Sequence, residues 1–290
     1  MKNQLIVVLA LVCLLAVPVA GNCQEGQDLV EQTLKGSINW SEGVVQAVGI
    51  GAPSEKHYGK PSARPMALRA AKLDAMRNIL EAINGVRIDG STIVRDYAVE
   101  SDIIRSRVEG MIQGAEVVKQ EYLSDGTIEI TMAMSLRGGF SQLVLPDEIK
   151  PLESVKPLTP MENFESAKPV TPMEHSSAVY TGLVVDARGL STRPAMSPKI
   201  LDENGQEVYG SAFVSREYAV QQGMSGYAKD IVAAQSNQRV TDNPITVKGL
   251  RTEGPGRSDI IISNADASAL RSASENLSFM KKCRVMIVVD

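Results

Sequence analysis

A proline-rich segment in the middle of the chain does most to limit how it can fold. Residues 146–177 hold six prolines, and the heptapeptide KPLTPME (156–162) returns as KPVTPME (168–174). Prolines hold φ near −65° and remove backbone donors, so the segment favours an extended, solvated chain that cannot bury enough surface to fold. We interpret 146–178 as a linker, able to span up to roughly 100 Å. The alternative is a pair of docking motifs for a groove-bearing partner.

The linker divides the chain into two candidate domains, residues 38–145 and 179–290. The 290 residues are 43% hydrophobic, which is enough for more than one core. The net charge is −4 and only 4% of residues are aromatic. Neither a basic field nor a set of stacking side chains is therefore available, and we predict no nucleic-acid partner.

The first 21 residues are typical of an export signal. Lys2 precedes an unbroken apolar run, Leu5 to Val17, which Pro18 ends before the small residues of VAG. The run is short for a retained membrane helix, although an uncleaved anchor is the alternative. We predict cleavage after residue 21, a lead segment at 22–37, and a periplasmic or outer-membrane-associated location.

Two cysteines remain in the predicted mature chain. Cys23 stands where a bacterial lipoprotein carries its lipid, but Ala20 and Asn22 fit a lipidation signal poorly, so we prefer ordinary cleavage and keep lipidation of Cys23 as the alternative. A disulfide between Cys23 and Cys283 is permitted in an oxidising compartment, and nothing in the sequence requires it.

The pattern of the first domain predicts an α+β fold, with one long helix on an antiparallel sheet. Val44–Pro53 reads as a strand, and a helix follows from about Ser62 to Asn84. We expect its buried stripe to consist of large apolar residues with alanines beside it, namely Met66, Leu73, Met76, Ile79, Leu80 and Ile83. Residues 85–97 (GVRIDGSTIVRDY) predict a strand or hairpin, and residues 115–136 a clear hairpin around Ser124-Asp125-Gly126.

Two stretches of this domain resemble a known family. WSEGVVQAVGIGAP, with the helix MALRAAKLDAMRNILE leading into GVRI, and VEGMIQGAEVVKQEYLSDGTIEITMAM are similar to the LPP-twenty lipoprotein family, which includes the flagellar envelope proteins FlgP and the amino-terminal region of FlgT. The resemblance covers about residues 40–136. It implies an exported, non-enzymatic protein that supports outer-membrane or flagellar structures, and it carries no catalytic residues with it.

The second domain predicts a smaller, mixed α+β module. YTGLVVDA, PITVKGLRT and SDIIIS read as strands, and PKILDENGQEVYG as a hairpin that turns at Asn204-Gly205. Ser263 can cap a helix with Asp266 at its third position. The final segment, CRVMIVVD, is apolar on both faces and therefore predicts a central strand.

A search for catalytic and metal-binding patterns finds none. The GIG at Gly49–Gly51 lacks the third glycine of a dinucleotide fingerprint, and we interpret it as turn glycines. Ser225 in GMSGY has no histidine base within a credible triad, because His57 lies in a loop and His175 in the linker. Two distant histidines and two separated thiols do not form a metal-ligand pattern.

We therefore expect no enzyme, cofactor or metal, but an exported envelope protein with a structural or assembly role, at the flagellar basal body or the outer membrane. Its partners would be copies of itself or other envelope proteins, with outer-membrane attachment only through a lipid on Cys23. The alternative is a periplasmic module that binds a small ligand or glycan.

Overall fold

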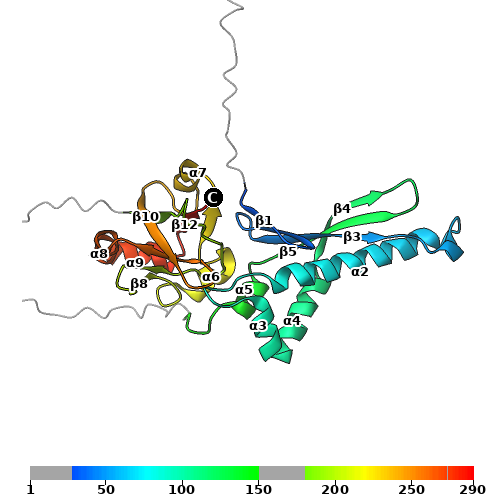
Figure 1. The fold of residues 1–290 in the computed structure, drawn as a ribbon, viewed down its shortest axis with the longest axis horizontal. Coiled ribbons are helices and arrows are strands. Elements are labelled where there is room, and N and C mark those ends of the chain that lie inside the picture. The colour runs from blue at the N-terminus through cyan, green and yellow to red at the C-terminus, as the bar shows by residue number, and fades with distance from the viewer. Residues whose placement is uncertain (1–27, 150–179, 273) are drawn as a thin grey trace, which may run out of the picture.

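A computed structural model describes residues 28–149, 180–272 and 274–290. The predicted signal peptide, Cys23, and nearly all of the predicted linker with its repeat and His175 lie outside these residues. The described chain is α+β, with an antiparallel five-stranded sheet that carries one long helix, followed by a seven-stranded mixed sheet (Figure 1). Among the described residues, no helix is both long enough and apolar enough to span a membrane.

The first sheet has the strand order β1-β2-β3-β5-β4, all antiparallel. Its strands are β1 (Val30–Gln32), β2 (Gly36–Asn39), β3 (Val44–Gly51), β4 (Glu116–Tyr122) and β5 (Ile128–Ser135). The 3-10 turn η1 (Glu55–His57) leads to the 22-residue helix α2 (Ala63–Asn84), which lies along β3 and β5. The predicted strand, helix and β4–β5 hairpin are confirmed.

The buried face of α2 agrees with the prediction near its C-terminal end, where Ile79 and Ile83 are fully buried, and differs in its first half. Ala67, Ala71 and Ala75 are fully buried, whereas Met66 and Leu73 are 45% and 58% exposed. The cause lies in β3, because a Cβ built on Gly49 or Gly51 would stand within 2.2 Å of the α2 backbone. These two glycines are strand residues that let the helix approach closely, so our interpretation of them as turn glycines was wrong.

Residues 85–97 form only a minimal version of the predicted hairpin. Arg87 and Ile93 make a single antiparallel bridge, the Ile88 N–H donates to the Thr92 carbonyl at 2.9 Å, and α3 (Val94–Glu100) then begins. Asp89 forms the turn, its carboxylate accepting from the backbone N–H groups of Ser91 and Thr92 at 2.7 and 2.9 Å. Helices α4 (Asp102–Gln113) and α5 (Gly139–Val144) complete the module.

The second sheet has the order β8-β7-β11-β10-β6-β12-β9, and its four strands β10, β6, β12 and β9 are parallel. Its strands and helices are β6 (Gly182–Asp186), β7 (Ile200–Leu201), β8 (Glu207–Tyr209), α6 (Arg216–Gln222), β9 (Gly226–Ala228), α7 (Ile231–Gln235), β10 (Pro244–Glu253), β11 (Asp259–Ile262), α8 (Asn264–Ser272), α9 (Ser274–Lys281) and β12 (Val285–Val288).

The last strand is buried on both faces, as its sequence predicts. Val285 and Ile287 pack in the large core, while Met286 and Val288 pack with Val184 in a smaller cluster that includes Ala234 of α7. β12 lies between β6 and β9, so it is an internal strand of the parallel part. The predicted cap of α8 is confirmed too, since Ser263 Oγ accepts from the Asp266 N–H at 3.0 Å.

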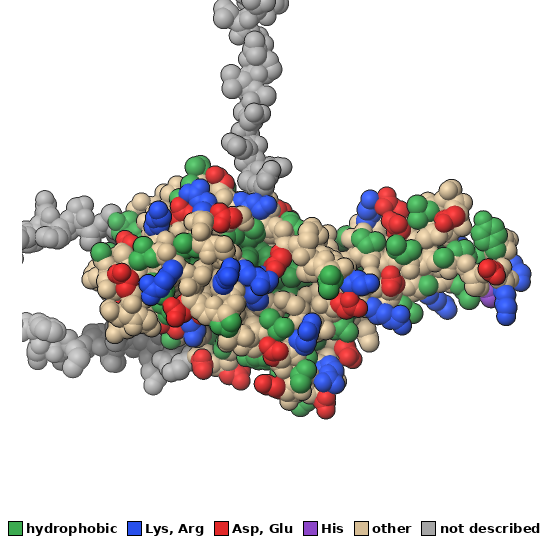
Figure 2. All heavy atoms as spheres, in the orientation of Figure 1, with side chains coloured by type: hydrophobic (Ala, Val, Ile, Leu, Met, Phe, Trp, Pro, Cys, Tyr) green, Lys and Arg blue, Asp and Glu red, His purple; other side chains and the backbone are tan. Residues whose placement is uncertain are grey.

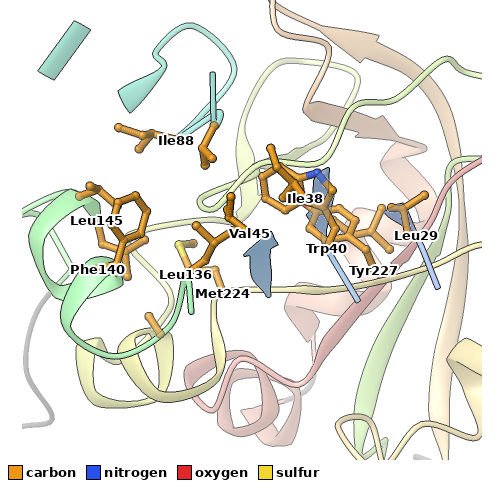
Figure 3. Packing of buried hydrophobic residues seen from close by; sticks show 14 of the residues in the cluster. Leu29, Ile38, Trp40, Val45, Ile88, Leu136, Phe140, Leu145, Met224 and Tyr227 are labelled. Atoms are coloured by element: carbon orange, nitrogen blue, oxygen red, sulfur yellow. The ribbon is translucent and has the colours of Figure 1, made fainter. Parts of the chain in front are cut away.

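The two sheets share one hydrophobic core rather than standing apart. The large buried cluster runs from Ile38 and Val45 of the first sheet to Leu183 and Val185 of the second. Figure 3 shows side chains of both parts meeting, with Trp40 and Leu136 on one side and Met224 and Tyr227 on the other. The predicted linker could have held two bodies apart, but the apolar surface at the junction is buried by direct contact.

Candidate functional site

No cluster of reactive side chains lies in the described part of the chain. No group of three or more His, Cys, Asp or Glu residues there could hold a metal ion. Cys283 is a free thiol with no exposed surface, and burial raises its pKa to about 12. His57 Nδ1, in η1, is 2.8 Å from the Oγ of Ser54, the residue that precedes this turn. Ser225 Oγ is buried and lacks a described hydrogen-bond partner.

The junction between the modules is built around one carboxylate, Glu31. Its Oε2 accepts from the Trp40 indole N–H at 2.8 Å and from Arg87 Nη2 at 2.5 Å, and Arg193 Nη2 lies 3.4 Å from its Oε1. Arg87 Nε also donates to the Pro194 carbonyl at 2.7 Å. One arginine that is almost fully buried therefore joins β1 to a loop of the second module.

The charge state of Glu31 follows from these contacts. Burial acts to raise its pKa, but the hydrogen bond and charge of Arg87, with contributions from Trp40 and Arg193, lower the pKa of Glu31 below its usual value. Trp40 packs edge-on against Tyr227 at 5.8 Å between ring centroids, and the Tyr227 hydroxyl donates to the Ala195 carbonyl at 2.8 Å. The polar groups of the junction thus hydrogen-bond to one another, and their role is structural.

A cleft lies beside β9, an edge strand of the second sheet. It has a volume of about 590 Å³ and is lined by polar and charged side chains, among them Arg137, Lys229, Asp230 and Asn237. Arg239 also lines it, but its guanidinium donates to the carbonyls of Gly223 and Cys283 at 3.1 and 2.7 Å, as well as to that of Gln222. The Arg239 guanidinium is therefore already engaged by backbone carbonyls.

The first module continues beyond the end of β2 as a narrow projection. β2 pairs with β3 only from Val44 to Ala47, so residues 48–78 and 117–131, which we call the arm, consist of α2 on three strands (Figure 1). Apolar side chains remain on its surface, as Figure 2 shows. Those of the strands and the hairpin turn are Val48, Ile50, Val117, Val118, Tyr122 and Leu123, which are between 41% and 54% exposed.

The two edge strands of the arm, β3 and β4, differ in whether their outward backbone groups have hydrogen-bond partners. On the β3 side, where β2 no longer pairs, the Ile50 N–H donates to Asp74 Oδ2 at 2.9 Å and Asn78 Nδ2 donates to the Val48 carbonyl at 2.7 Å. Helix α2 thereby satisfies this edge with its own side chains. Such a device prevents another strand from pairing there.

The opposite edge of the arm is open. β4 is the last strand in its sheet, and all seven of its residues are exposed. The Leu123 N–H donates to the Thr127 carbonyl, at 2.9 Å. Because hydrogen-bonded pairs alternate along an antiparallel ladder, the backbone groups of Glu121 and Lys119 also face β5, and those of Gln120 and Tyr122 face outward. This edge is the candidate association surface.

The comparison with known proteins concerns only the second module. Residues 182–290 match the family described as Treponema pallidum Tp0624, second domain. The match begins at the first residue of β6 and extends to the end of the chain, so it covers the whole seven-stranded sheet and less than half of the chain. No curated protein matches the chain. The arm therefore lies outside the matched region.

Sequence reasoning did not locate either the junction or the open edge. Glu31 lies in what the sequence suggested was a lead segment, and its partner Arg87 comes 56 residues later, in a predicted strand or hairpin. No spacing rule links them. The hairpin of residues 115–136 was predicted, but strand order alone decides that β4 rather than β5 is the edge.

Proposed function

We propose that the protein is an exported, non-enzymatic component of the cell envelope that acts by association with copies of itself or with other envelope proteins. The arm is the observation that carries the proposal. It projects from the shared core, exposes apolar side chains, and leaves one of its two edges unpaired while α2 closes the other. A projecting part with one open edge suits strand pairing between proteins.

Three further points support the proposal. The sequence begins with the pattern of an export signal, and the first module resembles the LPP-twenty family, whose members support outer-membrane or flagellar structures. The described residues also lack a metal cluster and a nucleophile with a base. The envelope location, at the outer membrane or the flagellar basal body, belongs to the same proposal.

The test is the size of the mature protein in solution. Size-exclusion chromatography with light scattering, from about 1 to 500 µM, should show oligomers whose population grows with concentration. A monomer throughout that range would contradict self-association. Deletion of the coding sequence, with motility and envelope integrity measured in parallel, separates a flagellar role from a general envelope role. Mass spectrometry of the mature amino terminus decides whether Cys23 is lipidated.

The cleft beside β9 favours a second candidate, a module that binds a small polar ligand. Its volume of about 590 Å³ is within the range of small-molecule sites. Screening the mature protein against sugars and amino acids by thermal shift tests this. A ligand that raises the melting temperature in the wild type but not in Lys229→Ala would support it.

A further inference from the structure

We propose that the open edge of the arm pairs with the same edge of a second copy, so that β4 lies antiparallel to its symmetry mate with Gln120 opposite Gln120. The inference rests on the proposed function and names its partner and contact. It follows from three features of the β4 edge: the direction of its backbone groups, the order of its charges, and the space around it.

The backbone groups restrict how two β4 edges can meet. Only residues whose N–H and C=O groups face outward can form the hydrogen-bonded pairs of the new ladder. In β4 these alternate residues include Gln120 and Tyr122, because the Leu123 N–H is bonded within the hairpin. A symmetric pair can therefore be centred on a residue but not between two residues. A centre at Val118 or before it would put the bulge between Val117 and Lys119 inside the paired segment, and a centre at Tyr122 would use only the end of β4, which leaves Lys119, Gln120 and Glu121.

The charges select one of these three centres. Centring on Lys119 places two lysines directly opposite each other, and centring on Glu121 does the same with two glutamates. Like charges directly opposite each other destabilise a sheet. Centring on Gln120 places each Lys119 opposite the Glu121 of the other copy. This register is the one of the three that joins opposite charges.

The same charges already attract each other within one strand. Lys119 Nζ lies 2.9 Å from Glu121 Oε2, with both side chains at least half exposed. In the pair, each lysine would gain a second carboxylate across the dyad, and two crossed ion pairs would form. The bulge between Val117 and Lys119 falls at the ends of the paired segment, so it leaves the central three residues regular.

The arm leaves room for the second copy. Helix α2 lies over β3 and β5, and the dyad falls outside β4. With neighbouring strands about 4.8 Å apart, the two α2 axes would lie about 19 Å from each other on the same face of the joined sheet. Helices about 10 Å across do not collide at that separation. Pairing would give a continuous sheet of ten strands with two-fold symmetry, which uses up both open edges.

Cysteine cross-linking of the mature protein tests the register. In a Cys23→Ser background, where the remaining thiol is the buried Cys283, Gln120→Cys should form a disulfide-linked dimer under mild oxidation. Residues of a hydrogen-bonded antiparallel pair have Cα atoms about 5.5 Å apart, which suits a disulfide. Lys119→Cys and Glu121→Cys should cross-link poorly alone and efficiently when the two variants are mixed. Equal cross-linking of all three variants alone would overturn the proposal.

Charge exchange provides the matched control. Lys119→Glu and Glu121→Lys should each raise the dimer dissociation constant by about tenfold, since each converts both crossed pairs into repulsion. The double variant restores the opposite charges and should dimerise like the wild type. If the singles dimerise as tightly as the wild type, or if the double variant is weaker than either single, the register is wrong.

The outcomes separate this inference from the proposed function. Oligomers that persist without Gln120→Cys cross-linking and without a response to the charge variants would overturn the β4 contact and leave association by another surface. A mature protein that is monomeric up to about 500 µM would overturn the β4 contact between copies and leave only association with other envelope proteins.

Discussion

Replacing Arg87 by alanine should release the junction between the two modules. Arg87 is 5% exposed, and its side chain serves both sides of the contact, donating to Glu31 in β1 and to the Pro194 carbonyl at 2.7 Å. Its guanidinium also lies 5.7 Å from the ring centroid of Trp40. The substitution removes all three interactions together and leaves the partly buried Glu31 carboxylate without its main cationic partner.

The magnitude follows from what is left unpaired. Removing one partner of a buried ion pair costs about 3–5 kcal/mol, and a hydrogen bond to a charged group is worth about 1.5–3 kcal/mol. The Glu31 side chain is 27% exposed and keeps its contacts with Trp40 and Arg193, so the lower end applies. We expect a loss of about 3 kcal/mol in the free energy of unfolding.

The assay uses the single tryptophan of the chain. Trp40 is 5% exposed and lies in the junction, so its fluorescence reports separation of the modules, while far-UV circular dichroism reports the whole fold. In a urea titration the two signals of the wild type should coincide, because the modules share one core. In Arg87→Ala the fluorescence midpoint should fall by about 1 M.

Arg105→Ala is the matched control. Arg105 also contacts a carboxylate and a backbone carbonyl, with Asp102 at 3.4 Å and Ala98 O at 3.0 Å, but its side chain is 50% exposed. Exposed pairs of this kind contribute about 0–1 kcal/mol. If Arg87→Ala shifts the fluorescence midpoint no more than Arg105→Ala does, the junction is not held by the buried arginine and the reasoning fails.

Three further predictions concern single positions. Arg87 lowers the pKa of Glu31 in the folded protein. The stabilisation from this ion pair should therefore be complete above pH 4.5 and be lost as the pH falls through the lower folded pKa. Glu31→Gln should unfold with a flatter acid dependence, and an unchanged profile would contradict this. Gly51→Ala should lower the free energy of unfolding in urea by about 3 kcal/mol, because the new Cβ would meet the α2 backbone at 2.1 Å. Gly110→Ala in α4 is the control: it has open space around it and should be neutral or stabilising by up to about 1 kcal/mol. In a Cys23→Ser protein, Cys283 should release no chromophore from a thiol reagent at pH 8 until denaturant is added, because burial raises its pKa to about 12; rapid release from the native protein would show an accessible thiol.

Elements with a strong local pattern were predictable from the sequence. The alternation of Ile128, Ile130 and Met132 predicted the inner face of β5. The segment VMIV, apolar on both faces, predicted an internal strand. The capping pair Ser263 and Asp266 likewise needed only neighbouring residues. In each case the physical cause, whether strand alternation or a local hydrogen bond, acts within a few residues of chain.

The face that α2 buries could not be predicted in the same way. Counting large apolar residues favours the side of Met66 and Leu73, and the alanines form an equally regular row. The choice was made by Gly49 and Gly51, which lie in another element and admit the helix backbone so closely that only methyl groups fit between. The same glycines, seen as sequence, resembled a turn.

The sequence by itself determined an antiparallel sheet with one long helix, a second mixed module, and their principal strands and helices, because these depend on residues close together in the chain. Tertiary structure alone decided that the modules share a core through Arg87 and Glu31, and that β4 is the open edge of the arm. Burial and strand order arise from contacts between segments far apart in the chain, and such contacts leave no periodic trace in either segment.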